Sequence, residues 1–530
     1  MIDPLPVTII GSGPAGVAAA RALIEARVPI RMIDAGDAPP TRPAAERPSL
    51  ATLRAGAPGA VQYLLGDDLG GLRDMHEYSP KLRSAIDGAL IAGYAEANRI
   101  APENFNLVGM LSRGGLSNIW GAVVSVFDEH DLKEFPITIA DLLPHYREIA
   151  EAIGISGVAI GDDMAEIHGA GLTLQPPLPL SPATQIVMDK YGRTKRTANF
   201  RLGRSRNAVL TETLGPRGAC TEDMACMWGC GRGAIYNSAD DVTALMTVPG
   251  FRYQGNTLVQ RLTRQEDRYC IHATDKSGIE TKFESRTVIL AAGTLASTRL
   301  VLDFLGRVDI PVPLLNSPAM AMAFWVPARI GKPLPATGFG MAQASFRVDI
   351  PDSRDSYALD LLYAGESIGA PDLIARMPTT RRGGIRILRS LLSGLLIGLM
   401  YFPSDFSRNQ AKLRRDRDGN TTLTVTGGLD PQFQEIASKT IRCVAKEFRR
   451  AGAWLLPGSA HPYRPGAEVH YGGTLPMGAT STADGEIAGA KGLYVVDGSI
   501  LPCLPAKHHT FTIMANARRI GKHIAEQARG

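Results

Sequence analysis

The chain has 530 residues, enough for roughly two to four domains of average size, and its 45% hydrophobic and 21% charged residues are typical of a folded globular protein. The net charge of +5 gives no support to nucleic-acid binding, and no uninterrupted apolar stretch reaches the roughly 18 residues that a membrane-spanning helix needs. The six cysteines include no Cys-x-x-Cys pair, and the first strand begins too early to leave room for a secretion signal. We therefore expect a soluble cytoplasmic protein without disulfide bonds.

The first predicted element is a strand–turn–helix–strand unit. A β-branched strand at residues 7–10 leads into Gly11-Ser12-Gly13-Pro14-Ala15-Gly16, an alanine-rich helix to about residue 26 and a second strand over 29–33. In such a turn the glycines allow a tight bend, close approach of a pyrophosphate and close helix packing. Asp34 follows, 18 residues after the last glycine, where a carboxylate can bind a ribose hydroxyl. The pattern predicts a dinucleotide site; the motif alone does not separate NAD from FAD, although its position favours FAD.

Two later segments fit the same cofactor domain. Residues 112–121 are glycine-dense and form either an ordinary loop or a place where backbone passes close to a flat ligand beside Trp120. A strand meander is expected from residue 257, and it closes on an apolar run over 287–292 that ends at Gly293. Such a run is typical of a strand buried on both faces of a parallel sheet. The cofactor domain is therefore predicted to be discontinuous.

Three cysteines in the middle of the chain invite a metal-site interpretation. Cys220, Cys226 and Cys230 are spaced by six and four residues, outside the usual zinc and iron–sulfur patterns. We therefore predict structural cysteines near a turn and no metal site.

The segment from residue 376 to residue 402 combines arginines with an apolar run. Its apolar residues at 385, 388, 392, 395 and 399 follow helical spacing. One interpretation is a buried helix or strand of the second domain, which is the usual structure of such a stretch. The other is an amphipathic segment over 385–402 that makes peripheral contact with a membrane surface or an apolar substrate.

The carboxy-terminal region carries the most specific pattern. His470-Tyr471-Gly472-Gly473-Thr474 is followed by a strand at 492–496 that ends in Asp497-Gly498-Ser499. Lys507-His508-His509-Thr510 then precedes a final helix with apolar residues on one face. A neutral imidazole is a suitable proton acceptor near pH 7, because its ordinary pKa is about 6.5. The histidines of these blocks are therefore candidates for acid–base chemistry.

Together these motifs resemble the glucose–methanol–choline (GMC) flavoprotein oxidoreductases. The resemblance covers most of the chain, is highly specific in the carboxy-terminal blocks and loose in the middle, and the loop at 114–120 is similar to that of the pyranose-oxidase branch. It implies an α/β fold: an FAD-binding Rossmann-like domain with a second α+β substrate-binding domain on an antiparallel sheet. We expect the FAD-binding domain to comprise residues 1–125, 241–305 and 461–530, and the substrate-binding domain to comprise residues 126–240 and 306–460.

The resemblance also implies the site residues. His470 lies beside flavin N5 in this arrangement, paired with the residue eleven positions after Asp497, which is His508. His509 stands where many relatives have proline, so the alternative is that His509 faces the flavin. Some pyranose-oxidase-like members bind FAD covalently through a histidine just before the tryptophan; Ile119 occupies that position, which predicts non-covalent FAD. The predicted cofactor-binding residues are Gly11, Gly13, Pro14, Ala15, Gly16, Asp34, Gly115, Ser117, Asn118, Gly293, Asp497, Gly498, His509 and Thr510.

The implied function is FAD-dependent oxidation of an alcohol group, with a sugar or another polyhydroxylated compound among the candidate substrates. A base removes the hydroxyl proton while the carbon-bound hydride passes to flavin N5. We expect His470 to be the base and His508 to orient the oxygen, with the reverse assignment open. The final helix, beginning near Thr510, would stabilise negative charge on the reduced flavin. The alternatives are a non-redox lyase on the same fold and a non-enzymatic FAD-binding protein. The expected electron acceptor is oxygen, a quinone or a redox protein.

Overall fold

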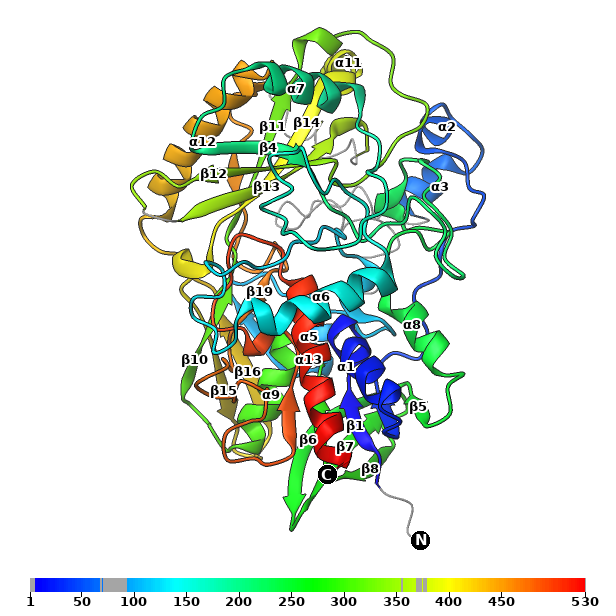
Figure 1. Cartoon of the computed structure of the whole chain (residues 1–530), viewed down its shortest axis with the longest axis vertical. Helices are drawn as coiled ribbons and strands as arrows, with labels where there is room; N and C mark the ends of the chain where they lie inside the picture. The colour runs from blue at the N-terminus through cyan, green and yellow to red at the C-terminus, as the bar shows by residue number, and fades with distance from the viewer. Residues whose placement is uncertain are drawn as a thin grey trace.

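The computed structural model describes residues 5–66, 69, 93–353, 356–367, 374 and 379–529 of the chain. A parallel sheet lies near the two termini, and a large antiparallel sheet lies towards the opposite end of the long axis (Figure 1). Helices cover both sheets. This combination confirms the predicted α/β class with an antiparallel second sheet.

The parallel sheet is built from short, buried strands. In spatial order these are β20 (Leu493–Val495), β9 (Val288–Leu290), β1 (Val7–Ile10), β2 (Ile30–Ile33) and β5 (Phe251–Gln254). All neighbours pair in parallel. Because helices cover the sheet, the strands need apolar residues at successive positions, as their sequences have. The predicted strand that ends before Gly293 is therefore confirmed as β9 of this sheet.

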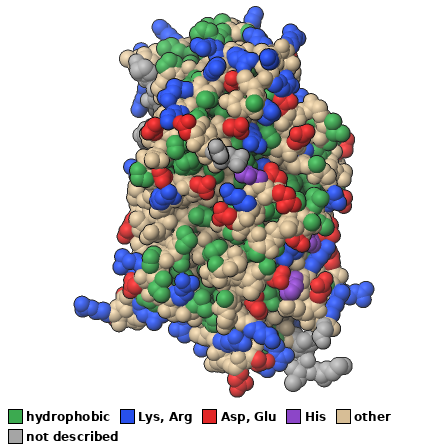
Figure 2. Space-filling model, turned by 60° about the vertical axis from the view of Figure 1, so that its left-hand side comes forward, with side chains coloured by type: hydrophobic (Ala, Val, Ile, Leu, Met, Phe, Trp, Pro, Cys, Tyr) green, Lys and Arg blue, Asp and Glu red, His purple; other side chains and the backbone are tan. Residues whose placement is uncertain are grey.

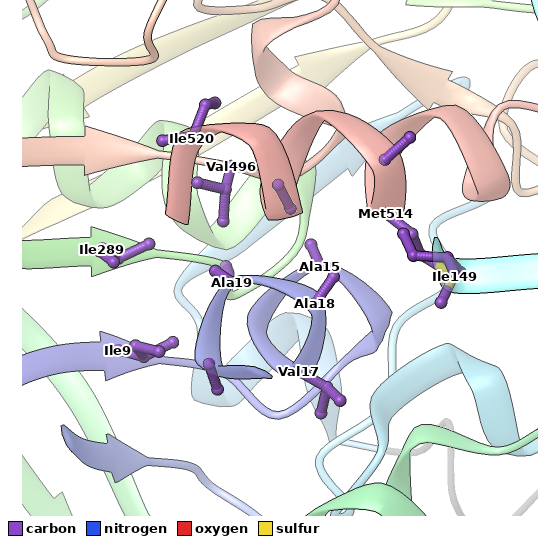
Figure 3. Packing of buried hydrophobic residues seen from close by; sticks show 14 of the residues in the cluster. Ile9, Ala15, Val17, Ala18, Ala19, Ile149, Ile289, Val496, Met514 and Ile520 are labelled. Carbon is purple, nitrogen blue, oxygen red and sulfur yellow. The ribbon is translucent and has the colours of Figure 1, made fainter. Parts of the chain in front are cut away.

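Two helices pack against each other over this sheet: α1 (Pro14–Glu25) and α13 (Thr510–Arg529). Figure 3 shows Ala18 and Ala19 of α1 facing α13, which contributes Ile520 to the same buried cluster. A Cβ at Gly521 would lie 2.8 Å from the carbonyl oxygen of Ala19. Small residues on both helices therefore allow the close approach. A third helix, α6 (Ile139–Ile153), lies beside α13.

A separate three-stranded sheet flanks the parallel sheet. Its strands are β6 (Thr257–Gln265), β7 (Arg268–Asp275) and β8 (Glu280–Ser285), all antiparallel. The turn between the last two is held by Asp275, whose carboxylate accepts hydrogen bonds from the backbone N–H groups of Ser277 and Ile279, each at 2.9 Å. The predicted strand meander from residue 257 is confirmed.

The largest sheet has seven antiparallel strands. They are β17 (Trp454–Leu455), β11 (Ala319–Trp325), β14 (Leu395–Tyr401), β13 (Tyr357–Ala364), β12 (Ala344–Asp349) and β4 (Phe200–Arg204), with β18 (His461–Pro462) also paired to β11. One face packs against α7 (Pro182–Arg193) and α12 (Phe433–Arg450). The rings of Phe324 and Phe448 stack in this core with centroids 4.2 Å apart. The opposite face lines a cavity.

A fourth sheet, with five strands, joins segments from both predicted domains. Its strands are β19 (Tyr471–Gly472), β10 (Pro311–Asn316), β15 (Asn409–Arg415), β16 (Thr421–Thr426) and β3 (Ile100–Glu103). It packs against α9 (Thr294–Phe304) through Leu302, Leu314 and Leu423. Strands β10, β15 and β16 come from the range 306–460, which we had assigned to the substrate-binding domain. They pair here with strands from the other predicted domain, so the proposed boundaries cut through this sheet.

The remaining elements are short. They are α2 (Leu50–Arg54), α3 (Ala60–Leu65), α5 (Tyr94–Ala97), α8 (Ser238–Leu245) and the 3₁₀ turns η3 (Gly115–Asn118), η4 (Cys226–Trp228), η5 (Pro327–Arg329), η6 (Gly365–Ser367), η7 (Leu392–Gly394), η8 (Ser404–Phe406) and η9 (Gly498–Ile500).

The arginine-rich, apolar segment divides into two elements. Helix α11 (Arg381–Leu391) ends where the helical spacing predicted continuation, and residues 395–401 instead form β14, paired with β11 and β13 on its two sides. The interpretation as a buried strand is therefore confirmed for residues 395–401. The helical spacing to residue 399 does not correspond to one helix, because two neighbouring strands satisfy the backbone of this apolar run. Peripheral membrane contact stays a prediction for α11 alone.

Helix α11 keeps apolar side chains on the surface, with Ile385 42% and Ile387 45% exposed. Figure 2 shows basic side chains gathered at the end of the molecule where α7, α11 and α12 lie in Figure 1. Among the described residues, no helix is long and apolar enough to cross a bilayer.

Candidate active site

A cavity of about 1180 Å³ lies between the parallel sheet and the seven-stranded sheet. Residues at the carboxyl ends of β1, β2, β9 and β20 line one side, and side chains of β11, β13 and β14 line the other. The carboxyl edge of a parallel sheet is where ligands bind in open α/β folds. The volume exceeds that of a usual small-molecule pocket and suits a dinucleotide together with a small substrate.

The glycine turn, where the sequence predicts nucleotide binding, lines one part of this cavity. Gly11 has a φ of +107°, and a Cβ there would lie 2.3 Å from the carbonyl oxygen of Ala291 on the neighbouring strand. A Cβ at Gly16 would lie 2.1 Å from the carbonyl oxygen of Gly11. No atom lies within 4 Å of a Cβ built at Gly13. The first and last glycines therefore serve backbone packing, and the middle one leaves open space beside the N-terminus of α1.

Asp34 lines the cavity at the end of β2. Its carboxylate accepts hydrogen bonds from the backbone N–H groups of Ser12, at 2.6 Å, and Gly36, at 2.7 Å. Burial raises the pKa of Asp34, and these two backbone hydrogen bonds oppose that rise. The carboxylate, predicted to bind a ribose hydroxyl, is thus fixed next to the glycine turn.

The glycine-dense loop lies against the same turn. A Cβ at Gly115 would lie 3.7 Å from Cα of Gly13, and Gly115, Ser117 and Trp120 line the cavity. Asn118 turns inward instead: its Nδ2 donates to the carbonyl oxygen of Gly115 at 2.7 Å. Asn118 and Gly16 were both predicted to bind the cofactor, but neither lines the cavity. Asn118 supports the loop, and Gly16 allows the first helix to pack closely against the turn.

Asp497 connects the ends of two strands of the parallel sheet. Its Oδ2 accepts hydrogen bonds from Gly293 N at 3.0 Å and Ser297 Oγ at 2.5 Å. Its Oδ1 accepts from the backbone N–H of Ser499 at 3.0 Å and from Oγ of the same residue at 2.6 Å. With its oxygens engaged in this way, Asp497 holds Gly293 and Gly498 in place at the cavity wall.

Three histidine rings meet at the other end of the cavity. The centroid of His470 lies 5.1 Å from that of His508 and 5.0 Å from that of His509, and all three residues line the cavity. Tyr401 of β14 stacks on His470 at 4.6 Å and meets the ring of His508 edge-on at 5.0 Å. The chain thus brings together the predicted pair and the alternative third histidine. Thr510, also predicted to contact the cofactor, lines the cavity at the first position of α13.

These imidazoles are neutral at pH 7. Burial lowers the pKa of His470 well below its usual value, and the two neighbouring histidines lower it further. Burial also lowers the pKa of His508 to about 3 and that of His509 to about 4. Nδ1 of each of the three rings, and Nε2 of His508, have no hydrogen-bond partner among the described residues. Buried polar nitrogens without partners indicate a site completed by a bound group.

An ion-pair cluster missed by the sequence analysis supports the histidine loop. The Lys507 ammonium is 1% exposed and donates to Asp131 Oδ2 at 2.6 Å, Asp128 Oδ2 at 2.8 Å and Val126 O at 3.2 Å. Asp131 also accepts a hydrogen bond from Tyr357 Oη at 2.7 Å. This cluster links the residue before His508 to a loop far away in the sequence, so no local pattern could have revealed it.

The three mid-chain cysteines are free and surround a small pocket. Burial raises the pKa of the Cys220 thiol to about 12 and also raises that of Cys226, so both are protonated at neutral pH. Among the described residues, no group of three histidine, cysteine or acidic side chains has the arrangement of a metal site.

Comparison with known proteins agrees with this architecture. Residues 407–517 match the family model of the carboxy-terminal domain of GMC oxidoreductases. Across 98% of its length the chain is 24% identical to paromamine 6'-oxidase of Streptomyces fradiae and 23% identical to 6'''-hydroxyparomomycin C oxidase of Streptomyces lividus, covering 91% of each.

Among solved structures, pyridoxine 4-oxidase from Mesorbium loti has a similar fold. The TM-score is 0.60 at 15% sequence identity, and the similarity covers 98% of this chain and 99% of that one. The matched carboxy-terminal residues include His470, His508 and His509, which line the cavity between the parallel sheet and the seven-stranded sheet. The carboxy-terminal part of the chain therefore matches GMC oxidoreductases, and the chain as a whole is similar to proteins named as oxidases.

Proposed function

We propose that this protein is an FAD-dependent oxidoreductase that oxidises an alcohol group of a small molecule at the histidine end of the cavity. The observation that carries the proposal is the meeting of neutral, buried imidazoles with unpartnered nitrogens in the same cavity as a dinucleotide-binding turn. Three neutral bases without partners suit a reaction that removes a hydroxyl proton.

The cavity residues fit FAD. The open space at Gly13 and the N-terminus of α1 suit the pyrophosphate, and the fixed carboxylate of Asp34 suits a ribose hydroxyl. The N-terminus of α13, at Thr510, suits the negative charge of a reduced flavin. Ile119 before Trp120 has no nucleophilic atom, which supports non-covalent binding. When bound, FAD supplies the acceptor of the hydride.

Within this proposal His470 accepts the hydroxyl proton and His508 holds the substrate oxygen. Tyr401 stacks on the His470 ring, and the hydrogen bond from Ser317 N to the His470 carbonyl oxygen, at 3.0 Å, fixes the backbone at that residue. The apolar side chains of β11 and β14 exclude water from the reacting carbon. The reverse assignment, with His508 as the base, is equally compatible with these positions.

The relatives support an alcohol substrate and oxygen as electron acceptor. All three are named as oxidases, two for paromamine and 6'''-hydroxyparomomycin C and one for pyridoxine. An amino sugar or a related polyhydroxylated ring is therefore the first class to test. A quinone or a redox protein is the alternative acceptor.

The direct test is an anaerobic titration of the purified flavoprotein with a panel of alcohols and sugars, followed by absorbance. Bleaching of the oxidised flavin band by a panel member is the expected result, and reoxidation on admitting air would identify oxygen as acceptor. Bound flavin that no alcohol bleaches would contradict the proposal and favour a lyase or a non-enzymatic FAD-binding protein.

The pH dependence of flavin reduction is expected to be flat on the acid side. A base must be neutral to act, and an exposed histidine with a pKa of about 6.5 would lose roughly tenfold in activity at about pH 5.5. Because burial lowers the pKa of His508 to about 3 and that of His470 well below its usual value, the rate with an uncharged alcohol should change less than about twofold between about pH 8 and pH 5.5. Stopped-flow reduction at saturating alcohol measures this, and a tenfold fall centred near pH 6.5 would contradict it.

A further inference from the structure

A buried carboxylate with one oxygen unpartnered in the described part of the chain lies two residues before His470 in the sequence and lines the same cavity. Glu468 is 6% exposed. Its Oε1 accepts hydrogen bonds from Asn316 Nδ2 at 2.7 Å and Gly466 N at 3.3 Å. Its Oε2 is buried and has no donor among the described residues. A buried acceptor without a donor either binds a group from outside the protein or lowers the stability of the folded state.

The backbone holds this carboxylate beside the base. Val469, between Glu468 and His470, has a φ of +62°, a conformation that β-branched residues rarely adopt. All three residues line the cavity. Strain of this kind persists where the surrounding structure enforces it, and it is concentrated at functional sites.

A polar relay fixes the Glu468 side chain. Asn316, which donates to it, is fully buried and accepts a hydrogen bond from Asn409 Nδ2 at 2.8 Å. Burial raises the pKa of Tyr401, the ring stacked on His470, and the charge of Glu468 adds to that rise. The hydrogen bonds to Oε1 therefore fix the orientation of the carboxylate.

The charges around the cavity favour a cation as the missing partner. No lysine or arginine is among the described residues that line it. The lining contains two other carboxylates, Asp34 and Asp497. Each of them accepts hydrogen bonds from backbone N–H groups on both of its oxygens, unlike Glu468. Burial without a counterion raises the pKa of Glu468 to about 7. A ligand ammonium would supply both a donor to Oε2 and the opposite charge, whereas a neutral hydroxyl supplies only the donor and an anion would be repelled.

We propose that Glu468 is a specificity-determining residue that binds the protonated amine of an amino alcohol while the hydroxyl of the same molecule lies at His470. This inference rests on the proposed function, because it names the substrate class of that site. Substrates would carry a primary or secondary amine a few bonds from the oxidised carbon.

The test compares matched alcohols that differ by one amine, in the flavin-loaded enzyme and in Glu468→Gln. Suitable pairs are 4-(aminomethyl)benzyl alcohol with 4-methylbenzyl alcohol, and glucosamine with 2-deoxyglucose. The expected result is a preference in kcat/KM for the aminated member, which falls by on the order of 30-fold or more in Glu468→Gln because a buried charge pair loses one partner. Glu468→Asp should retain part of the preference. Glu280→Gln, on the exposed strand β8, is the matched control and should not change the ratio.

A binding readout separates this inference from the proposed function. Benzylamine has no alcohol, and its binding to the flavoprotein is followed by calorimetry and by perturbation of the flavin spectrum. If no alcohol bleaches the flavin, the proposed function fails, while benzylamine binding that is lost in Glu468→Gln still supports an amine site. If the aminated and amine-free alcohols react equally, or if Glu468→Gln keeps the preference and the benzylamine affinity of the wild type, the inference is overturned.

Discussion

Replacing His470 with alanine is expected to lower the rate constant of anaerobic flavin reduction by on the order of 100- to 10,000-fold, the usual contribution of a general base, while FAD stays bound. The ring is buried and neutral, and it lies among the other two imidazoles of the cavity. Removing it leaves the hydroxyl proton without its acceptor, whereas the glycine turn that would hold the cofactor is unchanged. Stopped-flow reduction with a saturating alcohol measures the rate, and the absorbance ratio at about 280 and 450 nm measures flavin content.

Matched variants sharpen this test. His130→Ala removes an exposed histidine and should leave the rate unchanged. His508→Asn should retain more activity than His508→Ala, because an amide can still donate to the substrate oxygen. If His509→Ala is more damaging than His508→Ala, the pair is His470 with His509. A His470→Ala protein that holds FAD and is reduced at the wild-type rate would reject the assignment of the base.

Replacing Lys507 with methionine is expected to destabilise the protein by about 3–5 kcal/mol, because one partner of a buried ion pair is lost. Asp131, whose side chain is fully buried, would keep its charge without a counterion. The same change should also slow flavin reduction, because Lys507 directly precedes the histidine pair. The midpoint of thermal unfolding, measured at one scan rate with bound FAD held at the same occupancy, gives the first effect.

Two comparisons identify the cause. The double variant Lys507→Met with Asp131→Asn removes the unpaired charge and should recover part of the lost stability. Lys439→Met breaks an exposed pair with Asp352, 3.0 Å apart, and should leave the midpoint almost unchanged. An unfolding midpoint in Lys507→Met equal to that of the wild type would mean that the buried pair does not hold the histidine loop.

Much of the nucleotide end could be predicted because its requirements are local. The positive φ of Gly11 and the close contact between Gly16 and Gly11 both belong to a single turn. The glycine motif of six consecutive residues is therefore enough to predict them. The pairing of His470 with His508 was implied by the resemblance to GMC oxidoreductases, and the structure places both rings in one cavity. The individual roles of the supporting residues were less accessible. Asn118 belongs to the predicted loop, but only the packed structure shows that its amide supports that loop from within.

The amino-acid sequence by itself determined the strand–turn–helix unit, the histidine blocks and the resemblance to GMC oxidoreductases, because each depends on residue types within a short stretch of chain. The tertiary structure alone decided that residues 395–401 form a central strand, that Tyr401 covers His470, and that Lys507 pairs with Asp131. It also decided that Glu468, which lines the cavity, has one buried oxygen without a hydrogen-bond donor among the residues that the structure describes. The physical reason is that strand pairing, burial and ion pairing depend on neighbours that the fold brings from distant segments, and a local pattern contains no record of those neighbours.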